Sequence, residues 1–222
     1  CIDLCRTYRQ GDQDIKALDH VSIDIDSGDF VCLSAPSGGG KTTLLNAIGG
    51  LDRPDSGEIY IADQRIDLLS KAELADLRLR RIGFVFQSYN LLQQLNVLEN
   101  IKVPLQYQGL IGKDANAKCR ELANLVGLGS RIYHRPTELS GGQQQRVAIA
   151  RSLVNDPYFV LADEATGNLD SKTTDEVLEL FESLNASGKT IVMITHEDEV
   201  AARAKRVIRL RDGMIESDER NE

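Results

Sequence analysis

The sequence predicts an α/β protein with a mostly parallel sheet, because short apolar segments typical of buried strands alternate with segments of helical periodicity. Two observations lead to this prediction. A continuous apolar run at 30–33 is followed by a glycine-rich stretch and then by a helical face that includes Leu44 and Ile48. A second apolar run, at 158–162, ends in two acidic residues. Strands that alternate with helices in this way imply right-handed crossover connections.

A β-rich segment precedes the core. Val21, Ile23 and Ile25 alternate with polar residues, as in a half-buried strand. We expect this N-terminal segment to form an antiparallel β subdomain beside the parallel sheet. The remaining core elements are expected as strands at 82–86, 190–195 and 207–210, helices around 177–184 and near Val200, and a hairpin turn at Asp212-Gly213 that leads into Met214-Ile215.

The region from about 97 to 154 has helical periodicity and interrupts the core. Val97, Ile101 and Leu105 lie one turn apart, and Pro104 is expected to kink or end this first helix. We therefore predict one domain over 1–222. Its α/β core takes in about 1–88 and 155–222, and its inserted helical subdomain about 89–154.

The composition is that of an ordinary globular protein with an acidic balance. Of the 222 residues, 41% are apolar and 27% charged, and the formal net charge is −8. This charge argues against a nucleic-acid partner, which usually needs a basic face. The densest basic cluster, Arg78, Arg80 and Arg81, is interpreted as a solvated helix face or a protein contact. No apolar run approaches the roughly 20 residues of a spanning helix.

Four cysteines show neither a C-x-x-C pair nor a histidine-containing ligand pattern. We expect reduced thiols that pack as small hydrophobic side chains. They are Cys1, Cys5, Cys32 and Cys119.

The glycine-rich stretch at 35–43 nearly matches G-x-x-x-x-G-K-[ST], the phosphate-binding P-loop, and predicts a P-loop NTPase core. Glycines let backbone N–H groups turn toward phosphate oxygens, and the following helix N-terminus adds positive potential. Lys41 suits the β- and γ-phosphates, and the Thr42 hydroxyl suits Mg²⁺. Ala35 departs from the pattern, which has glycine there. The candidate nucleotide contacts are Ser37, Gly38, Gly39, Gly40, Lys41, Thr42 and Thr43.

Asp163 and Glu164 end the second apolar run. In α/β sheets, ligands bind at the carboxyl ends of the strands, so these carboxylates are expected beside the glycine loop. Asp163 suits the Mg²⁺ sphere, and Glu164 suits a base that orients an attacking water.

A second candidate anion site lies about a hundred residues after the first. The octet at 139–146, LSGGQQQR, precedes an apolar helix. Ser140 is a natural N-cap, and Gly141 and Gly142 expose backbone N–H groups at the helix start. A flexible capped helix would explain the serine and the glycines but not the whole octet.

The octet resembles the signature motif of the ABC ATPases, and the resemblance extends over nearly the whole chain. Residues 35–43 look like Walker A, and 158–163 like Walker B with Glu164 as its catalytic glutamate. The other motifs that resemble the family are Tyr8 as the adenine-stacking aromatic, Gln87 as the Q-loop glutamine, 167–170 as the D-loop and His196 as the H-loop histidine.

The resemblance implies an ATPase that uses ATP and Mg²⁺ and acts as a head-to-tail homodimer. Each ATP would lie between Walker A of one chain and the signature of the other. The implied further nucleotide contacts are Ser140, Gly141, Gly142, Gln143 and Asp170. Glu164, His196 and Gln87 would be catalytic, and Thr42, Gln87 and Asp163 would hold the metal. The implied further partner is an integral membrane permease, with the ATPase on the cytoplasmic face of the cell membrane.

Within the family, four segments look most like the ATPases of lipoprotein-releasing systems, macrolide-type exporters and the cell-division ABC pair. They are 83–87, 90–92, 141–146 and 165–170. Export or extraction of a lipophilic substrate or lipoprotein is the favoured function. The open alternative is a cell-division type ATPase, coupled through a membrane partner to an extracytoplasmic hydrolase.

Other classes fit less well. A DNA-repair ATPase would need a long coiled coil between Walker A and the signature, and no sustained heptads occur there. A ribosome-associated ABC protein would carry two cassettes, and a small-molecule kinase would lack the octet.

Overall fold

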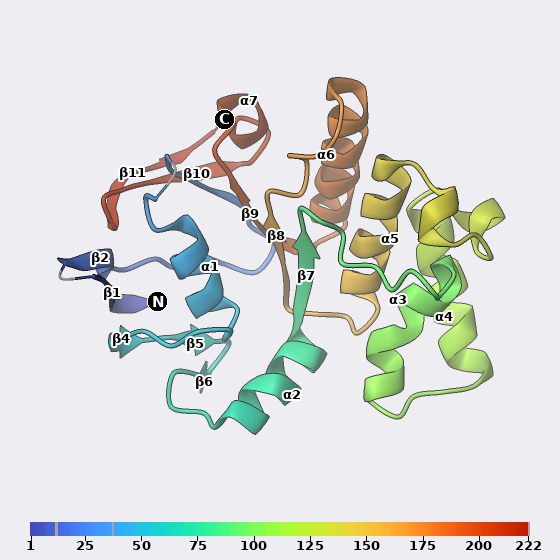
Figure 1. Cartoon of the computed structure of the whole chain (residues 1–222), viewed down its shortest axis with the longest axis horizontal. Coiled ribbons are helices and arrows are strands. Elements are labelled where there is room, and N and C mark those ends of the chain that lie inside the picture. The colour runs from blue at the N-terminus through green and yellow to red at the C-terminus, as the bar shows by residue number, and fades with distance from the viewer. Residues whose placement is uncertain (12, 37, 222) are drawn as a thin grey trace.

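The computed structural model describes residues 1–11, 13–36 and 38–221, so the candidate residue Ser37 lies outside the described part of the chain. Figure 1 shows a central sheet with a β-rich part on one side and the helices α3, α4 and α5 on the other.

The central sheet has the strand order β11-β10-β3-β9-β8-β7. All neighbouring strands pair in parallel except the hairpin of β10 and β11. This arrangement confirms the predicted α/β class and its mostly parallel sheet. The strands are β3 (Phe30–Ser34), β7 (Ile82–Phe86), β8 (Phe159–Asp163), β9 (Thr190–Thr195), β10 (Arg206–Arg211) and β11 (Met214–Arg220).

Both faces of this sheet are buried, which explains why its strands are continuous apolar runs. In β3, Phe30 and Cys32 pack into one apolar cluster, with helices α3 to α7. Val31 and Leu33 point to the opposite face and pack with α1 and the N-terminal strands. Side chains alternate across a strand, so each strand contributes to two cores. The covering helices are α1 (Lys41–Ile48), α6 (Ser171–Ala186) and α7 (Asp198–Ala201).

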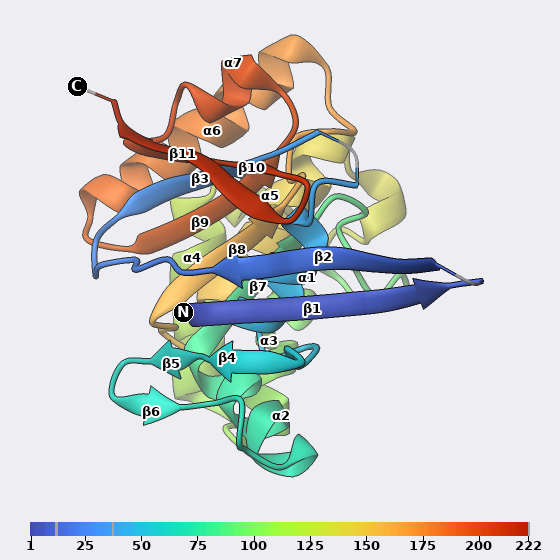
Figure 2. The same cartoon turned by 90° about the vertical axis from the view of Figure 1, so that its left-hand side faces the viewer.

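The N-terminal part forms an antiparallel sheet of order β2-β1-β4, which Figure 2 shows side by side, next to the small hairpin of β5 and β6. Helix α2 follows and begins with a capping box between Ser70 and Glu73. The elements are β1 (Ile2–Gln10), β2 (Gln13–Val21), β4 (Ser56–Glu58), β5 (Tyr60–Ile61), β6 (Gln64–Arg65) and α2 (Lys71–Arg81).

The strand predicted from Val21 to Ile25 is wrong in position, because β2 ends at Val21. The burial does alternate, with Ile23 buried and Asp24 exposed. Among the described residues, however, the backbone-to-backbone hydrogen bonds of 22–25 are limited to two between Ile23 and Cys1. The Ile23 N–H donates to the Cys1 carbonyl at 3.1 Å, and the Cys1 amino group donates to the Ile23 carbonyl at 2.9 Å. The alternating burial of 21–25 therefore belongs to a segment that packs on the core without a sustained ladder of backbone hydrogen bonds.

The inserted region contains α3 (Val97–Tyr107), α4 (Lys113–Leu125), two short 3-10 turns and α5 (Gly141–Leu153). Helix α3 continues through Pro104 to Tyr107, so the proline does not end the helix. The kink, which is the other expected outcome, stays a prediction. A proline removes one backbone donor, and the packing of Ile101 and Leu105 in the core outweighs that loss.

Helix α5 also contacts the core sheet. A Cβ added to Gly83 of β7 would lie 2.6 Å from the carbonyl oxygen of Ser152 in α5. The two elements therefore pack closely at this glycine.

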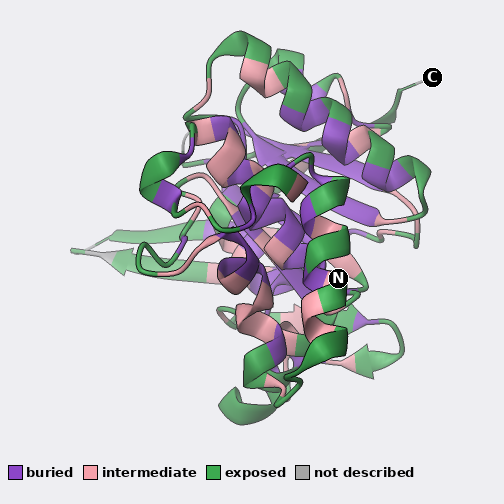
Figure 3. Cartoon of the chain, turned by 90° about the vertical axis from the view of Figure 1, so that its right-hand side faces the viewer, coloured by how far each residue is buried: buried purple, intermediate pink, exposed green. Residues whose placement is uncertain are grey.

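Figure 3 shows the exposed outer faces of the helices in green around buried strands. The proposed division of the chain into a core and a helical subdomain stays a prediction.

The basic cluster on α2 makes contacts within its own chain. Arg78 donates to the Gly50 carbonyl at 2.6 Å, and Arg81 lies over the Tyr158 ring at 4.7 Å. Arg80 pairs with Asp76 at 2.8 Å. Among the described residues, no helix has the length and apolar character needed to cross a bilayer.

Candidate functional site

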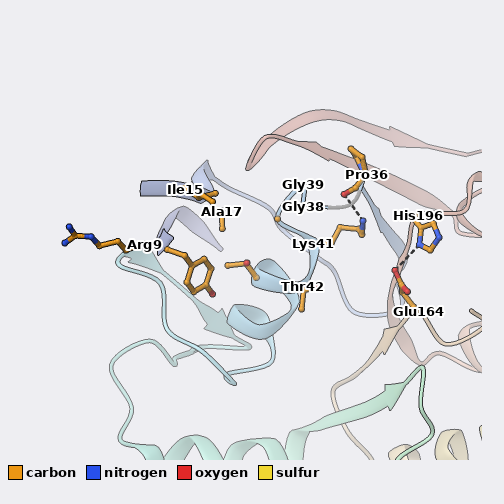
Figure 4. Close-up of a pocket in the computed structure, with 13 residues that line it drawn as sticks. Arg9, Ile15, Ala17, Pro36, Gly38, Gly39, Lys41, Thr42, Glu164 and His196 are labelled. Carbon is orange, nitrogen blue, oxygen red and sulfur yellow. Dashed lines mark hydrogen bonds and ion pairs between the residues drawn. The ribbon is translucent and has the colours of Figure 1, made fainter. Parts of the chain in front are cut away.

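A cavity of about 930 Å³ lies between the glycine loop, the N-terminal sheet and the carboxyl end of the central sheet. Figure 4 shows Ile15 and Ala17 on one side of the loop and Glu164 and His196 on the other, with the Arg9 side chain directed away from the loop. Its described lining consists of Tyr8, Arg9, Ile15, Ala17, Pro36, Gly38, Gly39, Gly40, Lys41, Thr42, Thr43, Glu164 and His196.

The glycine loop requires its glycines for two different reasons. Gly38 and Gly40 have φ angles of 81° and 95°, in the region that favours glycine. A Cβ at Gly40 would also lie 2.3 Å from the Ala17 carbonyl oxygen.

Ala35 stands where the P-loop pattern has its first glycine. It is buried and is not among the described residues with positive φ, so its side chain costs little backbone strain. Its methyl packs close to Gly39, where an added Cβ would lie 2.8 Å away.

Lys41 begins α1 and is buried despite its charge. Its ammonium donates to the carbonyl of Ala35 and, at 3.0 Å, to that of Pro36. Burial lowers the pKa of Lys41, and the nearby charges of Glu164 and Asp163 oppose that shift. The loop therefore holds a desolvated cation at the mouth of a helix N-terminus, where an anion would be strongly attracted.

Two acidic residues lie at the carboxyl end of β8, as predicted: Asp163 is its last residue and Glu164 follows it. Burial raises the pKa of Asp163, and the charge of Glu164 adds to that effect. Glu164 has a φ of 44°, a strained conformation for a residue that is not glycine, and its backbone N–H donates to Ile194 at 3.0 Å. Its Oε1 lies 2.9 Å from Nδ1 of His196. A carboxylate and an imidazole thus meet on the far side of the cavity from the loop.

Gln87 follows β7, which runs beside β8 in a register that pairs Phe86 with Asp163. The Gln87 carbonyl accepts from Asn168 at 3.0 Å, and its Nε2 donates to the same side chain at 3.4 Å. The Q-loop and D-loop segments are therefore bonded to each other. Gln87 lies beside the acidic strand end but is not among the described lining of the cavity.

The signature residues lie away from the cavity. Ser140 caps α5, where its hydroxyl accepts from the Gln143 N–H at 3.3 Å and the Gln143 side chain accepts from Ser140 at 3.0 Å. Gly142 is buried against α6. Asp170 caps α6 by accepting from Thr173, a bond that lowers the pKa of Asp170.

Within one chain, the described lining therefore joins Tyr8, the glycine loop, Glu164 and His196. It includes neither Asp170 nor any of the signature residues Ser140, Gly141, Gly142 and Gln143.

Several residues at the site were not identified from the sequence. Arg9, Ile15 and Ala17 line the cavity, and Ile15 could have been found from its pairing with Tyr8 across the β1–β2 hairpin. Gln145 is fully buried in α5 and donates to the Ala165 carbonyl at 2.7 Å. Arg151 binds the backbone carbonyls of Tyr89 and Asn90 after the Q-loop, at 2.8 and 2.5 Å. No local sequence signal marks the contacts of these two residues.

Comparison with known proteins identifies the family. Residues 18–167 match the ABC transporter family model. An uncharacterized ABC transporter ATP-binding protein of Thermotoga maritima is 49% identical over 99% of this chain and 94% of its own length. The macrolide export ATP-binding/permease protein MacB of Hyphomonas neptunium is 50% identical over 99% of this chain. The chain spans 34% of that MacB protein.

A solved structure agrees with these relatives. The ATP-binding cassette MJ0796, described as a post-hydrolysis dimer bound to ADP and Pi, superposes with a TM-score of 0.88 at 42% identity, covering 99% of this chain and 97% of the other. A second dimeric structure of the same cassette gives 0.87. This chain belongs to the ABC transporter family, as one of its ATP-binding, ATP-hydrolysing cassettes.

Proposed function

We propose that this cassette binds ATP with Mg²⁺ in the cavity described above and that the hydrolysis of ATP drives a membrane permease. The observation that carries the proposal is the meeting of the glycine loop, Lys41, Glu164 and His196 around one cavity. The loop N–H groups and Lys41 would bind the phosphates. Tyr8 would stack on the adenine. The Arg6 guanidinium lies over the Tyr8 ring, 4.9 Å from its centroid.

The donors near the strand ends fit Mg²⁺, which prefers oxygen ligands. The Thr42 hydroxyl, the Asp163 carboxylate and the Gln87 amide oxygen are the proposed ligands. Burial raises the Asp163 pKa and the charge of Glu164 adds to that effect; a divalent cation would relieve this repulsion between the two carboxylates. When bound, the metal would neutralise phosphate charge. Glu164, held by His196, would orient the attacking water.

The separation of the two anion sites supports a dimer. In the described residues the signature segment lies outside the cavity, so a second copy would have to supply Ser140, Gly141, Gly142 and Gln143, with Asp170 beside them. The solved relatives with this fold are described as dimers. Phosphoryl transfer depends mainly on positioning and charge neutralisation, which closure of such an interface would complete.

The MacB relatives support an export role. They are named ATP-binding/permease proteins, and the cassette corresponds to about a third of their length. We propose that this cassette works on the cytoplasmic face of the cell membrane with a permease that exports or extracts a lipophilic substrate or lipoprotein.

The test is the Glu164→Gln variant with ATP and Mg²⁺. We expect it to form a stable ATP-bound dimer by size-exclusion chromatography, because water activation is lost while binding is kept. A variant that stays monomeric at saturating nucleotide would contradict the dimer. Capture of a permease from solubilised host membranes by the tagged variant would support the coupled partner. Capture of ribosomal or DNA-bound proteins without a permease would overturn it.

A further inference from the structure

The N-terminal hairpin contains an irregularity that brings chemically distinct side chains together. Leu4 of β1 pairs with Val21 of β2, but Arg6 pairs with Leu18. One residue of β1, Cys5, therefore lies opposite two residues of β2, at 19 and 20. This is a β-bulge, a feature that redirects side chains and is often found at functional positions. The two strands run side by side in Figure 2.

The bulge changes which way the side chains project. In a regular strand, Asp19 and His20 would point to opposite faces. His20 instead has a φ of 56°, and its backbone N–H donates to the Cys5 sulfur at 3.4 Å. As a result, one ligand atom from each of Cys5, Asp19 and His20 lies within 4.8 Å of the others. The His20 Nε2 lies 3.9 Å from the nearer Asp19 oxygen.

A fourth residue holds the imidazole in place. The Asp3 carboxylate lies 2.7 Å from Nδ1 of His20, which leaves Nε2 directed toward Asp19. Asp3 is itself fixed, because its backbone N–H donates to the Ser22 hydroxyl at 2.8 Å. Histidines that bind metals almost always donate their other N–H to a carboxylate or carbonyl, which sets the tautomer and the ring orientation. Asp3 and His20 have this arrangement.

We propose that Cys5, Asp19 and His20 form a site for a divalent transition metal, Zn²⁺ by its ligand chemistry, with Asp3 orienting His20. A thiolate, an imidazole and a carboxylate match the ligand preferences of Zn²⁺ and exclude Mg²⁺ as the favoured ion. Bonds of about 2.0–2.3 Å in a tetrahedron place ligand atoms roughly 3.3–3.8 Å apart. The ligand atoms are 3.9 Å apart for His20 and Asp19 and within 4.8 Å for the other pairs, so these distances must shorten by up to about 1 Å. A water would complete the coordination, and the thiol proton would leave to solvent.

The surroundings of the three ligands permit that movement, but they also place a lysine that competes with the metal for Asp19. His20 is exposed, and Cys5 and Asp19 are partly exposed, so they can rotate without disturbing the core. The Lys16 ammonium lies 3.1 Å from both oxygens of Asp19 and competes for the same carboxylate. Removing this competitor should tighten metal binding, whereas a purely structural bulge would give no such response.

The site is separate from the nucleotide cavity but shares its strands. Cys5, Asp19 and His20 are not among the described lining residues, whereas Tyr8 of β1 and Ala17 of β2 are. A metal across the bulge would tie β1 to β2 close to the proposed adenine-side wall. The proposal does not depend on the proposed function, because its test is metal binding itself.

The test is a titration of the reduced protein with Co²⁺ in Mg²⁺-free buffer, followed by displacement with Zn²⁺. A thiolate ligand gives a sulfur-to-cobalt charge-transfer band, which separates this site from the acidic strand ends of the nucleotide cavity. We expect one band that saturates at one metal per chain. Cys5→Ser should abolish it, and Cys1→Ser, which changes a partly exposed thiol outside the cluster, should not.

The other variants test the geometry. Asp3→Asn keeps a residue that tolerates the left-handed backbone, and it should weaken binding by about 10–100-fold. His20→Asn should weaken binding further, His134→Asn should bind as the wild type does, and Lys16→Gln should bind more tightly. ATPase rates and circular dichroism check that each variant is folded.

Four results would overturn the proposal. Three concern the band: its absence from the wild-type protein, its survival in Cys5→Ser, and a saturation point of one metal per two chains. The fourth is equal affinity for wild type, Asp3→Asn and His20→Asn.

Discussion

Replacing Gly142 by alanine tests how tightly the signature helix packs on α6. A Cβ at this position would lie 2.1 Å from Cγ2 of Thr173. Thr173 cannot easily turn away, because its hydroxyl and its N–H both bond to the Asp170 carboxylate, at 2.9 and 3.0 Å. A β-branched side chain held in this way has few alternative rotamers. The added methyl must therefore push the two helices apart or break the Asp170 cap.

The expected cost follows from these contacts. Overpacking a well-filled site costs about 1–3 kcal/mol, and the better helix propensity of alanine returns up to about 1 kcal/mol. The free energy of unfolding should fall by about 1–2 kcal/mol. In a chain of this size, each kcal/mol lowers Tm by roughly 2–4 °C.

The matched control is Thr173→Ser, which deletes Cγ2 and keeps the hydroxyl that bonds to Asp170. Urea and thermal unfolding of the nucleotide-free protein should be measured for both single variants and for the double variant. We expect Gly142→Ala to be harmless, or slightly stabilising, in the Thr173→Ser background. A double variant as unstable as the additive sum of the two singles would refute the proposed clash.

Two further predictions concern the glycine loop and the acidic strand end. Ala35→Gly should lower the free energy of unfolding by about 1–2 kcal/mol, through a lost buried methyl and a freer unfolded chain, and leave ATP turnover within about twofold; a large loss of turnover would show that the alanine is specifically required. Asp163→Asn should raise the Tm of the nucleotide-free protein at neutral pH, because burial and Glu164 raise the Asp163 pKa in the folded state. A raised pKa means that the carboxyl stabilises the fold below its ordinary pKa and loses this contribution as the pH rises through the raised value. The Tm advantage of the variant should therefore shrink toward about pH 4, and an advantage independent of pH would contradict this cause.

The predictions that succeeded rest on local patterns with strong physical causes. A strand buried on both faces is apolar over most of its length, so β3, β8 and β9 can be recognised as strands from their apolar runs. The strand expected at Val21 to Ile25 failed because alternating burial also arises where a segment packs on a core without a sustained ladder of backbone hydrogen bonds. Periodicity reports which side chains are buried and does not report what the backbone bonds to.

The candidate site also has a part that the sequence predicts and a part that only the structure shows. The sequence by itself determined the family, the fold class and the glycine loop, because glycines, Lys41 and the following helix act through neighbours in the chain. Only the tertiary structure decided that Gln145 reaches Ala165, that Arg151 holds the segment after Gln87, and that a bulge sets Cys5 opposite two residues of β2. These contacts join residues 14 to 62 positions apart in the chain. Such pairs meet through strand register and helix packing, which arise from the burial of the whole core and leave no local signal in the residues themselves.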